Sequence, residues 1–312
     1  MGIVNEKALL QDAMEHGYTL AAFNFFNFDM LHAILEAAEE EDSPVIVQLC
    51  MGGRAYMRSL PRLAELVERY CRAYRVPIGF NHDHCPTVED ARAAIDAGIP
   101  AVMFDGSHLP FEENVRQTGQ IVAYAHQRGV TVEAELGCLP GFEDVTFAEK
   151  AVLTDPEQAR RFVELTGCDC LAVSVGTAHG GVLADEPLPL YFDRLEEIHR
   201  ALPGFPLVLH GAASLPDHLV EQVNQWGGRV EQMRICSEAD ISRCAGYGVC
   251  KANMDVDNFL AYTAELRRNL VSDPGEYNPM QYLARARDAF KEEVRHKLRH
   301  VVRSAGHGRL DR

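Results

Sequence analysis

Eight short apolar runs, separated by segments with helical spacing, limit what this chain can fold into more than any other feature of its sequence. The runs lie at residues 21–26, 44–50, 76–83, 100–105, 131–136, 171–176, 206–210 and 248–254. Continuous apolar runs of this length are typical of strands buried on both faces, and their alternation with helices is typical of a parallel sheet. Eight units predict a single α/β domain over residues 1–312, a (β/α)₈ TIM barrel. Amphipathic spacing around Lys291 and Lys297 predicts an extra C-terminal helix.

A doubly wound open sheet is the alternative fold for the same alternation. That fold places a glycine-rich dinucleotide-binding turn directly after its first strand. No such glycine pattern follows the run at residues 21–26. The sequence therefore favours the closed barrel.

The composition argues against several classes of partner. The formal net charge is −16, which disfavours nucleic acid and anionic membranes because those partners bind clustered lysine and arginine. No apolar stretch approaches the roughly 18 residues of a membrane span, and the N-terminal sequence lacks the basic and apolar regions of a secretory signal. Nine cysteines without a CxxC pattern are typical of reduced thiols. We therefore expect a cytoplasmic protein that binds small molecules.

Polar side chains end the predicted strands, and active sites of this fold assemble at those ends. His84, His179 and His210 come from three different strands. Three imidazoles with carboxylates around them suit a catalytic metal site with an open position, and zinc is the expected ion. The other polar residues at strand ends are Asn24, Asp83, Asp105, Glu133, Glu135, Asn253, Asp255 and Asp257. Because side chains alternate along a strand, the adjacent Asp83 and His84 are expected to point in different directions.

Longer motifs surround these residues over nearly the whole chain. They are Ala22-Phe23-Asn24, Asp83-His84, residues 102–110, residues 132–137, Leu153-Thr154-Asp155-Pro156, residues 176–180, Leu209-His210-Gly211 and Asn253-Met254-Asp255. In these motifs the chain resembles the class II, metal-dependent fructose-bisphosphate aldolases and their relatives that cleave other ketose phosphates. The resemblance implies reversible aldol cleavage of a ketose through a zinc-stabilised enediolate, in a homodimer or homotetramer. Cobalt or manganese is the alternative metal, and a monovalent cation is a further expected cofactor.

The same resemblance implies a role for each residue that matches the family's motifs. His84, His179 and His210 would hold the metal, with Glu135 and Asp105 beside an inward position that the metal can occupy. Asp83 would exchange a proton with the aldehyde-derived hydroxyl, and Asn253 would hold the enediolate. Glu143, on a glycine-flanked loop, would exchange the proton on the donor carbon. The expected substrate-binding residues are Asn24, Gly180, Gly211, Ser214 and Asp255.

The chain departs from the family at the positions that usually bind phosphate. Leu183 stands where relatives have lysine, Ala213 where they have serine and Val256 where they have threonine. Phe259 replaces an arginine, and Cys50 replaces a serine. Each charge-assisted hydrogen bond to a phosphate is typically worth roughly 1.5–3 kcal/mol, so their joint loss predicts a changed substrate. We expect an unphosphorylated or otherwise atypical donor in place of dihydroxyacetone phosphate.

Four alternatives remain open on the sequence alone. The first is an ordinary fructose 1,6-bisphosphate or other ketose-phosphate aldolase, because backbone amides after Gly180 and Gly211 are able to bind an anion. The second is a zinc hydrolase, because His82 and His84 mimic the paired histidines of metal-dependent amidohydrolases. The third is a Schiff-base aldolase that uses Lys251. The fourth is a non-catalytic partner subunit with the same barrel.

Overall fold

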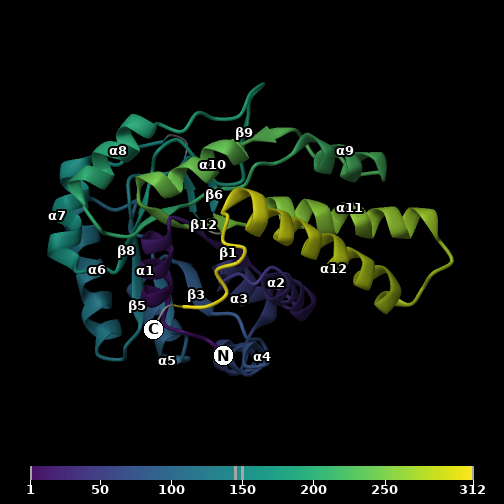
Figure 1. The fold of residues 1–312 in the computed structure, drawn as a ribbon, viewed down its shortest axis with the longest axis horizontal. Helices are drawn as coiled ribbons and strands as arrows, with labels where there is room; N and C mark the ends of the chain where they lie inside the picture. The colour runs from purple at the N-terminus through teal and green to yellow at the C-terminus, as the bar shows by residue number, and fades with distance from the viewer. Residues whose placement is uncertain (1, 144–145, 149–150, 311–312) are drawn as a thin grey trace.

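The computed structural model describes residues 2–143, 146–148 and 151–310, and the side chains of residues 142–150 lie outside what it describes. Eight parallel strands close into a barrel in the order β1-β2-β3-β4-β5-β8-β10-β12 (Figure 1). Their bounds are β1 Leu20–Asn24, β2 Val45–Leu49, β3 Ile78–Cys85, β4 Ala101–Phe104, β5 Thr131–Leu136, β8 Cys170–Val173, β10 Leu207–Leu209 and β12 Val249–Met254. Each predicted run overlaps one of these strands, so the predicted TIM barrel is confirmed.

Helices follow the barrel strands along the chain and cover the sheet. Those that the sequence predicts are α2 Phe28–Glu40, α4 Leu60–Cys71, α5 Val88–Asp96, α6 Phe111–His126, α7 Pro156–Thr166, α8 Phe192–Ala201, α9 Asp217–Gln225, α11 Val256–Ser272 and α12 Pro279–His296. The side chains of Asn27, Thr87 and Asp155 each accept a hydrogen bond from a backbone N–H in the first turn of their helix. The cap at Thr87 thereby fixes the end of the short loop that follows Asp83 and His84.

Several elements have no clear signal in the sequence pattern. They are the helices α1 Glu6–His16, α3 Met51–Met57 and α10 Glu238–Cys244, the 3₁₀ turn η1 Ala245–Tyr247, and the short strands β6 Gly141–Glu143, β7 Thr146–Ala148, β9 Val182–Leu183 and β11 Met233–Arg234. The helix α1 covers the N-terminal end of the barrel. Its residues Leu9, Leu10 and Ala13 belong to the same buried apolar cluster as Leu20 and Val208 from the strands. The barrel interior is thus closed at the end opposite the predicted site.

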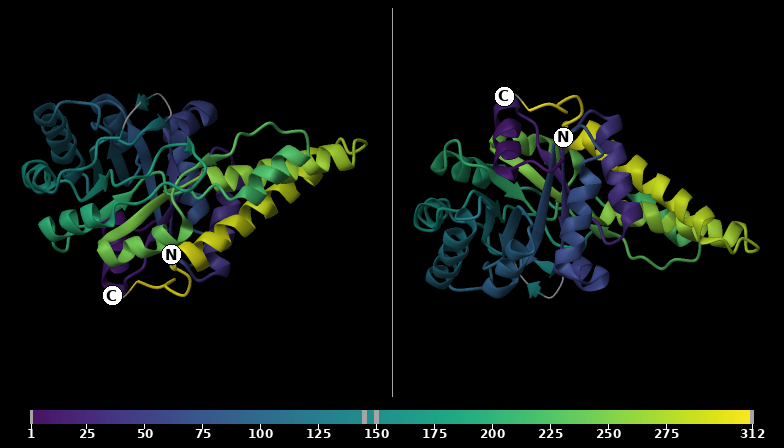
Figure 2. Two further views of the ribbon diagram at one scale, coloured as in Figure 1. Left: turned by 90° about the horizontal axis from the view of Figure 1, so that it is seen from above. Right: turned by 90° about the horizontal axis from the view of Figure 1, so that it is seen from below.

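The helices α11 and α12 form a hairpin that projects beyond the barrel (Figures 1 and 2). The helix α12 packs against both α11 and α2, and it confirms the predicted extra helix near the C-terminus. Among the described residues, no helix is both long enough and apolar enough to cross a membrane.

A buried cation joins the end of this hairpin to the barrel. Lys297 begins a π-helical turn (η2, Lys297–Val301), and its Nζ lies 2.7 Å from both Asp257 Oδ2 and Glu238 Oε1. The same atom lies 3.2 Å from Glu293 Oε1 and donates to Ser214 Oγ at 3.0 Å. Burial disfavours the charged form, but the neighbouring carboxylates outweigh burial and raise the pKa of Lys297 above its ordinary value. The ion pairs tie η2 to α10, α11 and α12.

We expect the substitution Lys297→Met to lower the free energy of unfolding by roughly 3–5 kcal/mol, because it leaves buried carboxylates without their cation. Lys291→Met is the matched control, since Lys291 pairs with Glu36 and Glu40 nearer the surface and such pairs contribute at most about 1 kcal/mol. Urea unfolding followed by circular dichroism measures both variants. Equal losses of stability would contradict the role given to Lys297.

Candidate active site

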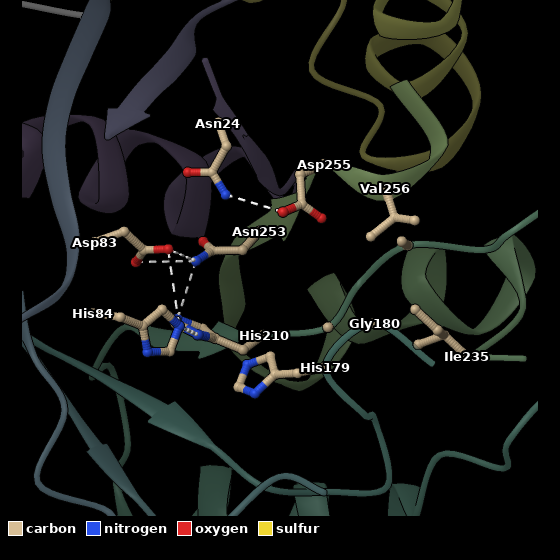
Figure 3. A pocket seen from close by; sticks show the side chains of 12 residues that line it. Asn24, Asp83, His84, His179, Gly180, His210, Ile235, Asn253, Asp255 and Val256 are labelled. Atoms are coloured by element: carbon tan, nitrogen blue, oxygen red, sulfur yellow. Dashed lines mark hydrogen bonds and ion pairs between the residues drawn. The ribbon is translucent and has the colours of Figure 1, made fainter. Parts of the chain in front are cut away.

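A cavity of about 190 Å³ lies at the C-terminal ends of the barrel strands (Figure 3). The residues that line it are Asn24, Asp83, His84, His179, Gly180, His210, Gly211, Ala213, Ile235, Asn253, Asp255 and Val256. All of them except Ile235 were singled out from the sequence. The closed barrel therefore brings together residues that lie far apart in the chain, as the strand-end argument predicted.

The backbone at His84 explains how two adjacent residues of β3 reach the same cavity. The pairing of β3 with β4 shifts register between His82 and Cys85, which indicates a β-bulge. His84 has a φ of 42°, in the left-handed region that residues other than glycine rarely adopt. The expectation that Asp83 and His84 point in different directions is therefore wrong, because the irregular backbone turns the imidazole toward the cavity.

The three predicted histidines face one another in the cavity. The His84 Nε2 and His210 Nδ1 atoms lie 2.8 Å apart, and the candidate ligand atoms of all three histidines lie within 4.8 Å of one another. Burial lowers the pKa of His179 well below its ordinary value, as does the repulsion that His84 and His210 exert when protonated. His179 is therefore a neutral imidazole at neutral pH, which is the form that binds a metal.

Carboxylates hold the far nitrogens of two of these rings. His84 Nδ1 lies 3.1 Å from Asp105 Oδ2, and His210 Nε2 lies 2.8 Å from Glu133 Oε1. Burial disfavours the charge on Asp105, but hydrogen bonds from His84 and Ser107 outweigh burial and lower the pKa of this carboxyl. An ionised carboxylate accepts the ring N–H, which leaves the opposite nitrogen with a lone pair directed into the site.

The second carboxylate oxygen of Glu133, the one that does not contact His210, pairs with Lys251. The Lys251 Nζ lies 2.6 Å from Glu133 Oε2, and both side chains are buried inside the barrel. Burial alone would raise the pKa of Glu133, but the charge of Lys251 and the hydrogen bond from His210 lower it to about 2. The pKa of Lys251 is raised, because the charge of Glu133 outweighs burial. A Schiff-base lysine reacts as a neutral amine, so this ion pair argues against Lys251 as a nucleophile.

The donor atoms fit a divalent metal. With their far nitrogens held by Asp105 and Glu133, His84 Nε2 and His210 Nδ1 direct lone pairs toward the same point, an arrangement that a shared cation stabilises. A second group of candidate ligand atoms, from His84, Asp105 and Glu135, also lies within 4.8 Å. Glu135 Oε2 lies 4.0 Å from His210 Nδ1. The second group contains His84 together with Glu135 and Asp105, the two carboxylates that were predicted to lie beside an inward metal position.

Asp83 and Asn253 form one wall of the cavity beside the histidines (Figure 3). Asn253 Nδ2 lies 3.2 Å from Asp83 Oδ1, 3.1 Å from Asp83 Oδ2 and 3.3 Å from His210 Nε2. Gln48 Nε2 donates to Asp83 Oδ2 at 3.0 Å. Asn253 Oδ1 has no hydrogen-bond partner among the described residues. The wall therefore presents an oriented carboxylate and an amide oxygen that is available to a bound molecule.

Asn24 and Asp255 form a second polar pair in the cavity. Asn24 Nδ2 donates to Asp255 Oδ2 at 3.1 Å. Burial raises the pKa of Asp255 to about 6, although the hydrogen bond from Asn24 opposes the shift. This carboxyl therefore changes its charge within the range of pH at which most enzymes work.

The end of the cavity beyond the histidines has an apolar lining. Gly180, Ile235 and Val256 lie together there (Figure 3). No lysine or arginine is present among the described residues that line the cavity. Leu183, at the position where the resemblance leads us to expect a lysine, has an exposed fraction of 69%. Sequence reasoning missed Ile235 because it follows a two-residue strand in a segment without a recognisable motif.

Ser214 is placed differently from its predicted position. Its Oγ lies 3.1 Å from Asp257 Oδ2 and accepts a hydrogen bond from Lys297 Nζ at 3.0 Å. It lines a separate cavity of about 580 Å³ beside α9, α11 and α12. Ser214 is not among the residues that line the cavity with the histidines, so its predicted role in substrate binding stays a prediction.

Glu143 belongs to β6, which pairs with β7 in a two-stranded hairpin. The hairpin begins beside the histidines, since Gly141 pairs with His179. Gly141 has a φ of 110°, and a Cβ at this position would lie 2.1 Å from His179 O, so only glycine allows the approach. The side chain of Glu143 and the adjacent Asp144 lie outside the described residues. The role of Glu143 in proton exchange stays a prediction.

His82 does not line the cavity. Its Nδ1 lies 3.1 Å from Asp83 O and 3.2 Å from Cys85 Sγ, and its side chain is fully buried. Burial and the charge of Arg54 lower the pKa of His82 to about 4. The His82 and His84 pair therefore does not form the two-histidine site that the hydrolase alternative needs.

Comparison with known proteins gives a match over almost the whole chain. The family described as fructose-bisphosphate aldolase class-II matches residues 4–307. The fructose-bisphosphate aldolase of Treponema pallidum is 41% identical over 98% of this chain and 98% of its own length. That of Thermus caldophilus is 42% identical over 95% of this chain and 97% of its own length.

Solved structures agree with this match. The YdjI aldolase from Escherichia coli K12 has a TM-score of 0.78 and 29% identity, over 98% of this chain and 100% of that one. A putative fructose-1,6-biphosphate aldolase from Coccidioides immitis has a TM-score of 0.80 and 28% identity, over 97% of this chain and 98% of that one.

We expect the substitutions His84→Ala, His179→Ala and His210→Ala each to weaken zinc binding by about a hundredfold or more, because each removes one of three ligands. His82→Ala is the control, since its imidazole is buried in the same strand but lies outside the cavity. Zinc content after equilibration in a metal buffer, measured by mass spectrometry, compares the four variants. Full zinc content in any of the first three, or loss in His82→Ala, would contradict the assignment.

Proposed function

Because this chain belongs to the class II fructose-bisphosphate aldolase family, we propose that it catalyses the reversible aldol cleavage of a ketose in the cavity that contains the three histidines. It is a class II aldolase, a carbon–carbon lyase that acts on small molecules. The observation that supports the proposal is the convergence of three buried histidines with a separate carboxylate, Asp83. Aldol cleavage needs stabilisation of the charge that forms beside a carbonyl, and it needs one proton carrier for each fragment. A metal on the three histidines would stabilise the charge, and Asp83 would serve as one of the two proton carriers.

His84, His179 and His210 are the proposed metal ligands, with Glu135 and Asp105 beside an inward position. We expect zinc, which when bound would act as a Lewis acid toward the carbonyl and hydroxyl oxygens of the ketose. Glu133 and Asp105 support the assignment, because each carboxylate fixes the orientation of a ligand ring. A non-catalytic subunit would have no use for this degree of organisation.

Asp83 and Glu143 are the proposed proton carriers. Gln48 and Asn253 both donate to Asp83, so its carboxylate is oriented before substrate arrives, and it would exchange a proton with the aldehyde-derived hydroxyl. Asn253 would hold the oxygens of the enediolate from the same wall. Glu143, on the hairpin that begins beside His179, would exchange the proton on the donor carbon and leave with the hairpin as the site opens.

The apolar end of the cavity supports a donor without phosphate. Ile235 and Val256 at this end, and Ala213 elsewhere in the lining, offer neither charge nor side-chain hydrogen-bond donors to the terminal group of a substrate. A doubly charged phosphate buried there would lose hydration without receiving charge-assisted hydrogen bonds from these side chains. A dihydroxyacetone-like or other hydroxyketone donor fits this lining without that cost.

A second candidate is cleavage of fructose 1,6-bisphosphate or another ketose phosphate. The names of the relatives favour it over the first candidate, since several proteins about 40% identical to this chain are called fructose-bisphosphate aldolases. Gly180 and Gly211 also line the cavity, and backbone amides near them would have to bind the phosphate alone. The lining of the cavity and the names of the relatives thus favour different donors.

A donor screen decides between the two candidates. The zinc-loaded protein is assayed with dihydroxyacetone phosphate, dihydroxyacetone and hydroxyacetone, each paired with phosphorylated and plain aldehydes. We expect kcat/KM for dihydroxyacetone phosphate to be at least about tenfold below that for the best unphosphorylated donor, given the lost phosphate contacts. EDTA and His210→Ala should abolish turnover. Efficient use of dihydroxyacetone phosphate would establish the second candidate instead.

Restoring hydroxyl groups at the apolar end tests the same argument by gain of function. We expect Ala213→Ser combined with Val256→Thr to raise kcat/KM for dihydroxyacetone phosphate by roughly tenfold or more, because each hydroxyl adds a hydrogen bond to the phosphate. Ser214→Ala is the control, since Ser214 lies outside this cavity. An unchanged preference among donors in the double variant, or a changed preference in the control, would contradict the proposal that the apolar end of the cavity binds the terminal group of the donor.

We also propose a cytoplasmic homodimer or homotetramer. All nine cysteines are free thiols, which fits a reducing compartment. The tip of the α11–α12 hairpin exposes Tyr277 by 91% and Met280 by 70%, and exposed apolar side chains on a projecting element support a contact with a second copy.

A further inference from the structure

Glu6 is a buried carboxylate that the proposed chemistry leaves without a role. It is the first residue of α1, and its exposed fraction is 1%. Neither of its carboxylate oxygens has a hydrogen-bond partner among the described residues. Burial of a polar group without a partner costs free energy, so a carboxyl in this position calls for a physical reason.

The carboxyl of Glu6 lies beside Gly79 of β3, since a Cβ at Gly79 would be 3.6 Å from Glu6 Oε2. The same Cβ would lie 2.9 Å from Ile46 Cγ1 and 3.1 Å from Leu9 Cδ1, so the glycine allows α1 to pack closely against the strands. Asn81, two residues further along the same face of β3, is fully buried, and neither of its side-chain polar atoms has a partner in the described structure. This polar floor has the character of a site for ordered water.

Lys251 lies at the same end of the barrel interior as α1, because it is in register with Leu20 and Val208, which belong to the buried cluster that contains Leu9 and Leu10 of that helix. Burial raises the pKa of Glu6 to about 7, the charge of Lys251 opposes the shift, and several carboxylates add to it. The titratable groups whose charge couples to Glu6 are Lys251 and Cys250 on β12, Glu133 on β5, Asp83 on β3, and Asp169 and Cys170 at the start of β8. The strand β1, which also packs against α1, contributes none.

We propose that Glu6 is a positioning residue for the metal site and acts from the floor of the barrel through Lys251 and Glu133 on His210. Lys251 contacts Glu133, and Glu133 accepts the N–H of His210, so the charge on Lys251 reaches the ligand in two contacts. An ionised Glu6 shares the charge of Lys251 and makes the surroundings of His210 more negative. The bound cation is then held more tightly above neutral pH. The inference rests on the proposed role of His210 as a metal ligand.

Zinc affinity at two pH values tests the proposal. Wild type, Glu6→Gln and Asp12→Asn are compared by competition with a chromophoric chelator. We expect Glu6→Gln to bind zinc about fivefold more weakly than wild type near pH 8 and equally near pH 6, because only the ionised carboxylate acts at a distance. Asp12 is a matched acid in the same helix that accepts a hydrogen bond from Tyr18 at 2.7 Å, and its variant should follow wild type at both pH values. Protonation of the ligand histidines affects all three proteins alike and cancels in the ratio.

A ratio of affinities that does not change with pH would overturn the proposal while leaving the metal site intact. Absence of zinc binding in all three proteins would instead overturn the proposed function. Infrared difference spectra between metal-free wild type and Glu6→Gln provide an independent readout, in which we expect one carboxyl to titrate near neutral pH. Titration of that carboxyl near the ordinary value for glutamate would also overturn the proposal. Matching thermal unfolding of the variants confirms that the comparison is between folded proteins.

Discussion

The carboxylate of Glu133 connects the interior of the barrel to the three histidines, and the order of the site depends on it. One oxygen accepts the N–H of His210 and the other pairs with Lys251. Neither charge would be stable alone in the buried interior of the barrel, since an unpaired buried ion loses its hydration without compensation. The pair fixes the ring of His210 before any ligand binds. A catalytic site thus obtains its rigidity from an ion pair inside the barrel, beneath the cavity.

Barrel closure supports a second feature, the irregular backbone at His84. A positive φ at a residue other than glycine costs on the order of 1–3 kcal/mol and persists only where the surroundings hold it. Here β3 is paired with β2 and β4, the cap at Thr87 fixes the following loop, and Asp105 holds the imidazole. The strain has a clear use, because it brings Asp83 and His84 into one cavity. A regular strand would direct these two side chains to opposite faces of the sheet.

The fold and most of the site follow from the sequence because their signals are local. Apolar runs indicate strands, and once the sheet is closed the C-terminal ends of all the strands lie at one rim of the barrel. The position of Ser214 and the contribution of Ile235 depend instead on how loops lie over the rim, which no local pattern encodes. The contact between Glu133 and Lys251 joins residues more than a hundred positions apart. The helix α1 was missed because its apolar face is short and covers the floor of the barrel.

The two ends of the cavity differ in how freely their residues can change. Asn253 donates hydrogen bonds to Asp83, so replacing either residue leaves its partner buried and unsatisfied. Ala213 and Val256 have no polar side-chain atoms, and their substitution disturbs no such network. Selection for a new donor can therefore act at the apolar end without loss of the fold or of the proton-transfer geometry. Under the proposed function, this asymmetry would let the chain keep its proposed metal ligands and proton carriers while its preference for a donor changes.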